Sequence, residues 1–303
     1  MLRNNSNNLN GWLCLDKPKG ISSNLTLIKV RKTLGVRAGY VGTLDPFASG
    51  VLPIAMGEAR KFIRFIEEAE KEYIFTMVFG KTTDTLDKTG TITQVCDHIP
   101  EKNEVLGVLH EFVGEIYQVP PVFSAIKVDG RRACDRVRFG ESVQLQPRKV
   151  KIFNIKIMDG DLPENELCLD VVCSKGTYIR SLARDIAAKL ETLAYVKTLR
   201  RTKSGFFLIN NAIPLEKLLE IKDTTDLVDI LTSLESPLDD IPALYLGSEG
   251  IARLRNGVRF CVENPAITSL NVRILSDVRG TFHGIGFIAD DGVVTAVRMC
   301  VSE

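Results

Sequence analysis

Asp45 is the one carboxylate in a stretch of mostly small and apolar residues, positions 40–57. Gly42 and Gly50 flank it, and glycine lets the backbone turn where other residues resist. Pro46 disfavours helix at the residue before it, which predicts that Asp45 lies at a strand end or in a loop. Because an unpaired buried charge is too costly to keep, we expect this carboxylate to be paired, hydrogen-bonded or functional. A turn or capping role is the plainer alternative.

Two basic stretches accompany this carboxylate. The formal net charge is only +1, so the chain as a whole lacks the strongly basic balance typical of nucleic-acid binding. Between positions 127 and 151, however, basic residues greatly outnumber acids, and a second cluster contains no acid. Such runs are often a solvated surface, but beside a presented carboxylate they favour a track for a polyanion. The stretches contain Arg131, Arg132, Arg136, Arg138, Arg148 and Lys149, then Lys197, Arg200, Arg201 and Lys203.

The periodicity of apolar residues predicts the elements around these groups. Helical spacing occurs over residues 24–34, 58–68 and 178–190, and strand-like segments occur at 73–79, 150–158 and 167–173. Helices and strands interleave without a regular βαβ count, which favours an α+β fold over a doubly wound sheet. We therefore expect a mixed, mainly antiparallel sheet with flanking helices.

Two further segments organise the chain. Residues 120–149 are rich in Pro, Gly and Arg without a sustained period, and an insertion loop of that length is usually functional. A boundary is expected near 234–242, where prolines and acidic residues gather. Beyond it, three short strands with glycine turns predict a small β domain: Val272–Leu275, Thr281–Ile288 and Val293–Met299.

Composition restricts the class of protein. The 303 residues are 45% hydrophobic and 25% charged, as in a globular protein with a proper core, and no apolar run is long enough to span a bilayer. Residues 1–10 are asparagine-rich and predict a disordered tail. Seven scattered cysteines predict reduced thiols in a cytoplasmic protein. The three histidines and the missing phosphate-binding loops fit poorly with a zinc hydrolase, a histidine triad or a nucleotide enzyme.

A series of short sequence motifs, taken in their order along the chain, indicates a family. The chain resembles the TruB family of tRNA pseudouridine synthases over about residues 11–205, with the blocks in the family's order. Any single block is weak evidence, whereas the ordered set is very specific. The blocks are DKPKG at 16–20 with SSN at 22–24, GTLDP at 42–46, GVLP at 50–53, GEA at 57–59, KEY at 71–73, GKTTDT at 80–85, PPVFSAIK at 120–127, CSKGTYIR at 173–180 and LRRT at 199–202.

The resemblance implies a reaction and its catalytic residues. The family isomerises a uridine of tRNA: the N1–C1′ bond breaks, the base rotates and C5 bonds to C1′, so no cofactor and no metal are expected. Asp45 would act as the nucleophile or as the base that starts the rearrangement. Arg180 would orient that carboxylate and keep it ionised, and the less favoured alternative is an ordinary surface arginine on the polar face of a helix. Tyr73 would stack on the extruded uracil and assist proton transfer, or be a core aromatic.

Further residues follow by family position. Tyr40, Tyr178 and Leu199 would line the same pocket and Asp84 would help to close it, although a leucine is more often simple core and an aspartate in a turn is ordinary. The catalytic domain would span residues 11–240 and a PUA-like RNA-binding domain 241–303. The expected partner is the T stem-loop of tRNA, modified at uridine 55 by a monomer with no obligatory protein partner. The expected RNA contacts are Lys61, Lys127, Arg131, Arg132, Arg200 and Arg201.

The sequence departs from the family pattern at three positions. Tyr40 replaces the usual histidine and Val41 the usual threonine, and tyrosine cannot carry a positive charge to phosphate near neutral pH. Cys134 stands in the insertion where an aromatic residue is common. The first two changes predict a weakened or rewired RNA contact beside the catalytic loop, and the third puts the packing of the insertion in question.

Three other functions remain open at this point. A guide-RNA-dependent, dyskerin-like enzyme shares the catalytic block but is disfavoured by the lack of long basic termini and the faint C-terminal motif. A non-catalytic RNA-binding protein would be insensitive to Asp45→Asn. A metal-dependent nuclease using Asp45, Asp84 and Asp87 would lose activity on chelation.

Overall fold

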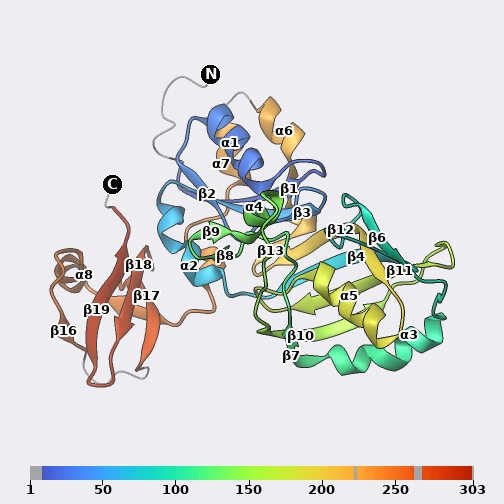
Figure 1. The fold of residues 1–303 in the computed structure, drawn as a ribbon. Helices are drawn as coiled ribbons and strands as arrows, with labels where there is room; N and C mark the ends of the chain where they lie inside the picture. The colour runs from blue at the N-terminus through green and yellow to red at the C-terminus, as the bar shows by residue number, and fades with distance from the viewer. Residues whose placement is uncertain (1–8, 222–223, 263–267, 302–303) are drawn as a thin grey trace.

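A computed structural model describes residues 9–221, 224–262 and 268–301 of the chain. The predicted N-terminal tail therefore lies almost entirely outside the described residues. The predicted α+β architecture is confirmed: one large sheet carries helices, and a smaller sheet follows at the C-terminal end (Figure 1). No described helix is long and apolar enough to cross a membrane.

The large sheet contains ten strands, with eight in the order β14-β1-β3-β12-β4-β11-β10-β7; β2 pairs with β3 and β13 with β12. Its pairings are antiparallel except β1 with β14 and β12 with β3, so the sheet is mixed and mainly antiparallel. Strand β3 is buried along its whole length, and β1 and β4 are mostly buried. The strands are β1 (Gly11–Lys17), β2 (Ala38–Tyr40), β3 (Ser49–Met56), β4 (Lys71–Phe79), β7 (Gly114–Gln118), β10 (Arg148–Ile157), β11 (Glu166–Cys173), β12 (Ala194–Ser204), β13 (Phe207–Leu208) and β14 (Ile213–Pro214).

Two groups of helices cover the two halves of this sheet (Figure 1). On one half, α1 (Ser23–Leu34) and α6 (Leu215–Glu220) pack with α7 (Thr224–Ile230) over β1 and β3, and Leu15, Leu34 and Leu52 belong to this core. On the other half, α3 (Lys102–Leu109) and α5 (Ile179–Lys189) pack over β4 and β11 with Phe75 and Leu182 in the core. In the sheet, β3 of the first half lies next to β12, and β12 and β4 contribute to the core of the second half.

Local sequence explains the helix ends. Ser22 caps α1 by accepting a hydrogen bond from the Leu25 amide, and Gly35 ends it in the left-handed conformation with φ of 66°. The helix predicted over 58–68 is shorter and irregular: a 3₁₀ turn, Gly57–Phe62, leads into the single turn α2 (Ile63–Ile66). The segment lies between β3 and β4, where little length is available for a regular helix.

The insertion predicted as a loop contains regular structure. A two-stranded hairpin joins β8 (Lys127–Val128) to β9 (Arg131–Arg132), and α4 (Ala133–Arg138) follows. These elements are too short to produce a hydrophobic period in the sequence, so periodicity does not predict them. Another small hairpin, β5 (Lys81–Thr83) with β6 (Ile92–Val95), lies beside β12.

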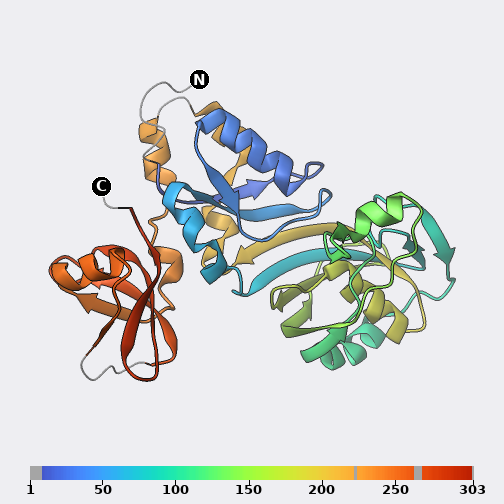
Figure 2. The same cartoon turned by 60° about the vertical axis from the view of Figure 1, so that its left-hand side comes forward.

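The C-terminal sheet has five strands in the order β15-β17-β18-β19-β16 and forms its own core around Val272 and Ile288. In both views it lies beyond α2, away from α3 and α5 (Figures 1 and 2). The three predicted strands are present within one or two residues of their expected bounds. The elements are β15 (Ala243–Leu246), α8 (Ser248–Arg255), β16 (Phe260–Cys261), β17 (Leu270–Ser276), β18 (Phe282–Ile288) and β19 (Val293–Met299).

Candidate active site

Asp45 lies in the loop between β2 and β3, as the glycines and Pro46 predict. Gly42 adopts φ of 65°, a left-handed conformation that other residues rarely take. Ser23, the first residue of α1, holds the neighbouring Leu44 from both sides: its Oγ donates to the Leu44 carbonyl at 3.0 Å and accepts from the Leu44 amide at 2.8 Å. The carboxylate is thus presented by a loop that is fixed to a helix end.

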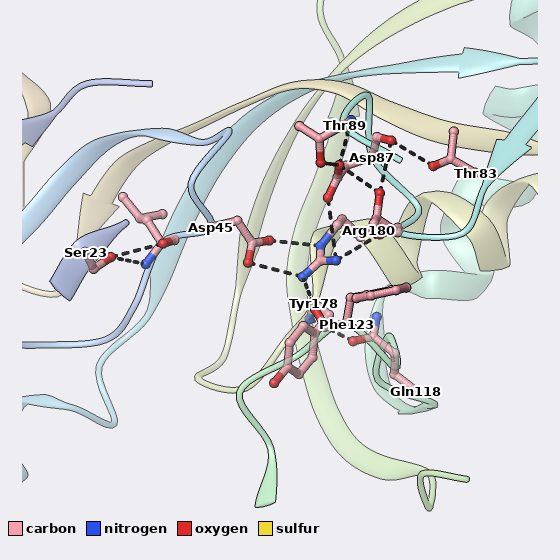
Figure 3. Close-up of polar contacts among 11 residues, drawn as sticks. Ser23, Asp45, Thr83, Asp87, Thr89, Gln118, Phe123, Tyr178 and Arg180 are labelled. Atoms are coloured by element: carbon pink, nitrogen blue, oxygen red, sulfur yellow. Dashed lines mark hydrogen bonds and ion pairs between the residues drawn. The ribbon is translucent and has the colours of Figure 1, made fainter. Parts of the chain in front are cut away.

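The carboxylate of Asp45 faces the guanidinium of Arg180 (Figure 3). Arg180 Nε lies 2.9 Å from Asp45 Oδ2, and Arg180 Nη2 donates to Oδ1 at 3.1 Å. Such a two-point pair fixes the orientation of a carboxylate as well as its charge. The expected pairing of these two residues, which are 135 positions apart in the chain, is present in the structure.

Arg180 is buried, with 4% of its side chain exposed, although the helical pattern places it off the apolar stripe of α5. Its position in the first turn of α5 directs it into the protein, where backbone acceptors surround it. Nη1 donates to the Thr85 carbonyl at 2.8 Å and Nη2 to the Phe123 carbonyl at 3.0 Å. Arg180 is therefore not the exposed surface arginine of the alternative interpretation.

Asp87, which the sequence suggested only as a ligand of the nuclease alternative, takes part in this site as a second carboxylate beside Arg180. Its side chain is 6% exposed and its Oδ2 lies 3.6 Å from Arg180 Nη1, the guanidinium nitrogen that does not pair with Asp45 (Figure 3). Oδ1 accepts hydrogen bonds from the Thr89 amide and the Thr85 hydroxyl, both at 2.9 Å. Asp84, which the family block suggested, instead accepts from the Thr91 amide at 2.8 Å and is absent from the lining of the Asp45 cavity.

The environment of Asp45 pushes its pKa in opposite directions. Burial raises the pKa of the Asp45 carboxyl, Arg180 lowers it and the nearby Asp87 charge raises it again; the balance lies above the ordinary aspartate value of 3.8. One face of the side chain nevertheless remains open, because 35% of it is exposed at the cavity. The Asp45 carboxylate is therefore partly desolvated, which favours reactivity, and it is still accessible to a ligand in the cavity.

A cavity of about 310 Å³ opens over this carboxylate. Its lining brings together most of the residues predicted for the site: Tyr40, Asp45, Tyr73, Tyr178, Arg180 and Leu199. Burial raises the pKa of the Tyr73 phenol, so this hydroxyl stays protonated near neutral pH and can donate a hydrogen bond. The Tyr178 amide donates to Gln118 Oε1 at 2.8 Å, which holds the start of α5. Tyr40, Tyr73 and Tyr178 provide aromatic surfaces beside the Asp45 carboxylate, on which a flat, polar ring can stack.

Arg201 also lines the cavity, although it was expected on an RNA-binding surface. Only 1% of it is exposed, and its Nε donates to the Val51 carbonyl at 2.7 Å. On β12 it pairs with Tyr73 of β4 on one side and with Gly50 of β3 on the other. A Cβ on Gly50 would lie 2.2 Å from the Arg201 carbonyl oxygen, so only glycine permits this approach. Gly50 thus allows the close approach of β3 to β12 that fixes the position of the buried Arg201.

Two buried lysines add positive charge near the cavity. Burial and the charge of Arg201 lower the pKa of Lys71, a lining residue, to about 8. Burial likewise lowers the pKa of Lys17 to about 8, partly offset by the Asp45 charge, and its ammonium donates to the Pro18 and Ile21 carbonyls at 2.8 Å. The surroundings of Asp45 are therefore rich in cations that favour an anionic ligand.

The remaining predicted RNA contacts divide into two groups. Lys61 and Arg200 are engaged within the protein: Lys61 pairs with Glu58 at 2.7 Å, and Arg200 forms a two-point pair with Asp16 at 2.7 and 3.2 Å. The side chains on the insertion, Lys127, Arg131 and Arg132, are exposed. Direct RNA contact by any of them stays a prediction.

The donor set does not resemble a metal site. Among the described residues, no three His, Cys, Asp or Glu side chains gather as potential ligands. The position between Asp45 and Asp87, where a cation would bridge two carboxylates, is taken by the Arg180 guanidinium. This arrangement gives no support to the nuclease interpretation.

Comparison with known proteins agrees with the site. The family model described as "TruB family pseudouridylate synthase (N terminal domain)" matches residues 29–179. The models for the "tRNA pseudouridylate synthase B C-terminal domain" and "Pseudouridine synthase II TruB, C-terminal" match residues 180–239 and 242–300. Together these three matches extend over most of the chain.

Individual proteins show the same relationship. The tRNA pseudouridine synthase B of Zymomonas mobilis is 44% identical over 276 residues, which cover 89% of this chain and 90% of the relative. That of Caulobacter vibrioides is 44% identical over 250 residues, covering 82% and 80%. A solved H/ACA RNP bound to a substrate RNA containing 2′-deoxyuridine shares the fold, with a TM-score of 0.73 at 22% identity over 96% of this chain and 85% of that one. This chain belongs to the TruB family of tRNA pseudouridine synthases.

Proposed function

We propose that this protein converts uridine 55 in the T loop of tRNA to pseudouridine and that Asp45 is the catalytic carboxylate. The observation that carries the proposal is the ion pair of Asp45 with Arg180 at the base of an aromatic-lined cavity. The relatives named tRNA pseudouridine synthase B support tRNA as the substrate.

The target base must leave its stack to reach this carboxylate. Asp45 lies inside a cavity of about 310 Å³, too confined for a paired or stacked nucleotide. Extruding a base costs a few kcal/mol, which stacking between aromatic side chains offsets. Tyr73 and Tyr178 are the aromatic residues beside Asp45 that can receive a uracil ring.

The ionised carboxylate begins the rearrangement. Asp45 either attacks C1′ of the ribose or removes a proton from the sugar; in both cases the N1–C1′ bond breaks and its electron pair stays with the uracil. When C5 later bonds to C1′, the bond from Asp45 to C1′ breaks in the first route, and in the second route Asp45 returns its proton to the sugar, so the free carboxylate is regenerated. The base rotates, C5 bonds to C1′, and the proton on C5 is lost as N1 gains one. The reaction is a balanced isomerisation that consumes no reductant and no phosphate.

Arg180 and Tyr73 have separate roles in this sequence. Arg180 holds Asp45 ionised and aims one face of the carboxylate into the cavity, while its remaining donors are fixed by Thr85 and Phe123. The Tyr73 hydroxyl stays protonated and is positioned to hydrogen-bond the base during proton transfer at C5. Arg201 and Lys71 favour the negative charge that the displaced uracil carries.

The test is mass-spectrometric mapping of pseudouridine in an unmodified tRNA transcript, incubated with the protein and EDTA. Wild type should modify the T-loop uridine alone. Asp45→Asn should lose turnover by at least about a thousandfold while still binding the RNA. A tRNA that is bound but left unmodified by wild type would contradict the stand-alone function and point to a guide-dependent enzyme or a binding module.

Thermal unfolding separates a catalytic loss from misfolding. Because burial raises the pKa of Asp45 in the folded protein above its value in the unfolded chain, the charge opposes folding at pH values above the unfolded pKa. Asparagine removes this charge. Asp45→Asn should therefore unfold at the same temperature as wild type or slightly higher, and a marked decrease would make the activity loss uninformative.

A further inference from the structure

A second hollow lies between the catalytic core and the C-terminal sheet. The groove has a volume of about 1010 Å³ and is walled by the turn before α2 on one side and by α8 and β19 on the other. In both views, the C-terminal sheet faces α2 across this boundary (Figures 1 and 2). None of the residues predicted for catalysis or uridine binding lines it.

The two walls are held together by specific contacts. Glu58 accepts a hydrogen bond from the Val301 amide at 2.8 Å, and Lys61 donates to the Met299 carbonyl at 3.2 Å. The Phe62 and Phe282 rings meet edge to face at 5.3 Å. The groove is therefore a built feature of the domain junction, and Lys61 helps to form it.

The lining is strongly cationic. Six basic side chains and only two acids border the groove, and both acids already have partners: Glu58 pairs with Lys61 at 2.7 Å and Glu67 with Lys175 at 3.5 Å. Within the part of the chain that the structure describes, five arginines have no carboxylate at ion-pair distance. They are Arg37, Arg60, Arg64, Arg255 and Arg298, all exposed.

This excess is local rather than general. The whole chain carries a formal net charge of only +1, so a groove with four more basic than acidic residues is a concentrated positive site. The three arginines of the catalytic domain and the two of the C-terminal domain converge from separate folding units. Arg255 is also oriented, because its Nη2 donates to His283 Nδ1 at 3.1 Å.

We infer that this groove binds the phosphate backbone of the tRNA outside its T loop, and that both domains contribute arginines to the same contact. The inference rests on tRNA as the substrate of the proposed function. Guanidinium groups match phosphate geometry with two-point hydrogen bonds, and unpaired arginines can exchange water and counterions for phosphate without breaking an ion pair. Glu67 lines both the groove and the Asp45 cavity, so one RNA can occupy both.

The test compares whole tRNA with a hairpin of the T stem-loop alone. One double variant, Arg255→Ser with Arg298→Ser, changes the C-terminal wall, and another, Arg60→Ser with Arg64→Ser, changes the catalytic wall. The control, Arg253→Ser with Arg279→Ser, removes two exposed charges of the C-terminal domain outside the groove. Dissociation constants are measured for both RNAs over a series of salt concentrations.

Each groove variant should bind whole tRNA about tenfold more weakly, and the slope of log K against log salt should decrease by about 2, one for each lost phosphate contact. Hairpin binding should be unchanged for all variants, and the control should retain wild-type affinity for both RNAs. Unchanged tRNA binding by both groove variants, or an equal loss in the control, would overturn the inference.

Turnover is followed separately. Because binding is measured directly, a failure of wild type to form pseudouridine would contradict the proposed function without deciding the role of the groove. At saturating tRNA, the groove variants should reach the kcat of wild type, since they leave the Asp45 cavity unaltered.

Discussion

The arginines of the Asp45 cavity and those of the 120–149 insertion share one chemistry in opposite surroundings. Arg180 and Arg201 are almost fully buried and are held by carboxylates and backbone carbonyls of distant segments. On the insertion, Arg131 and Arg136 are more exposed and pair with Glu141, ten and five residues away, at 2.9 and 2.6 Å. Arginines in the cavity thus set geometry, while those on the insertion are balanced by local acids and remain exchangeable.

The difference shows why counting basic residues misleads. The insertion looks strongly basic in sequence, yet Asp129, Asp135 and Glu141 each lie within ion-pair distance of an arginine. The groove beside the C-terminal sheet gathers its arginines from four separate segments of the sequence, and these arginines have no carboxylate partner among the described residues. Whether an arginine is available to bind RNA therefore depends on whether the fold places a carboxylate beside it, which the number of basic residues in a segment does not reveal.

The largest effect is expected from Arg180→Lys, which alters a buried arginine of the cavity. Lysine keeps the charge but cannot pair with Asp45 at two points while also reaching Thr85 and Phe123. A misplaced carboxylate should lower kcat about a hundredfold. Single-turnover kinetics on tRNA would measure it, with Arg184→Lys on the next turn of α5 as the control. Wild-type kcat in Arg180→Lys would show that orientation of Asp45 is unimportant.

A smaller effect is expected from Gly50→Ala, which acts on Arg201 through the backbone. The φ of 109° and the 2.2 Å approach to the Arg201 carbonyl leave no room for a methyl group. We expect a loss of about 1–3 kcal/mol in the free energy of unfolding, measured by urea denaturation. Gly107→Ala in α3, where a Cβ meets no atom within 4 Å, should be neutral or stabilising. Equal stability of Gly50→Ala and Gly107→Ala would refute the steric argument.

The smallest effect belongs to the insertion. Arg131→Ser removes an ion pair in which 55% of the arginine side chain is exposed, and such pairs contribute about 0–1 kcal/mol. Thermal unfolding should therefore be nearly unchanged, while affinity for tRNA should fall severalfold at low salt and less at high salt. A large drop in melting temperature would mean that the insertion arginines are structural, like those of the cavity.

Local sequence is enough to predict much of this molecule. Strand β4 and helix α5 follow from periodicity, and Gly42, Pro46 and Gly50 place Asp45 in a loop without reference to other segments. These features depend on neighbours within a few residues. The C-terminal strands were predictable for the same reason, because glycine turns separate short alternating segments.

Other features depend on contacts that the sequence does not reveal. Asp87 has no local signal, because its role arises from Arg180, 93 positions later in the chain. For Arg201 the sequence did contain a local signal. Residues 199 and 201 of a strand point to the same face, so a pocket role for Leu199 places Arg201 beside it. Without the strand assignment of β12, the charge cluster suggested a surface instead. The hairpin and α4 of the insertion are too short to produce any period.

If Asp45 reacts as a carboxylate that Arg180 holds ionised, the single-turnover rate must depend on pH. Ionisation is required, so the rate should fall as pH decreases, with an apparent pKa above the ordinary aspartate value of 3.8. Arg180 lowers that pKa, so the neutral variant Arg180→Gln should move the acid limb to higher pH. A rate that is independent of pH down to 4, or an acid limb at the same pH in Arg180→Gln, would show that Asp45 does not react as a carboxylate held ionised by Arg180.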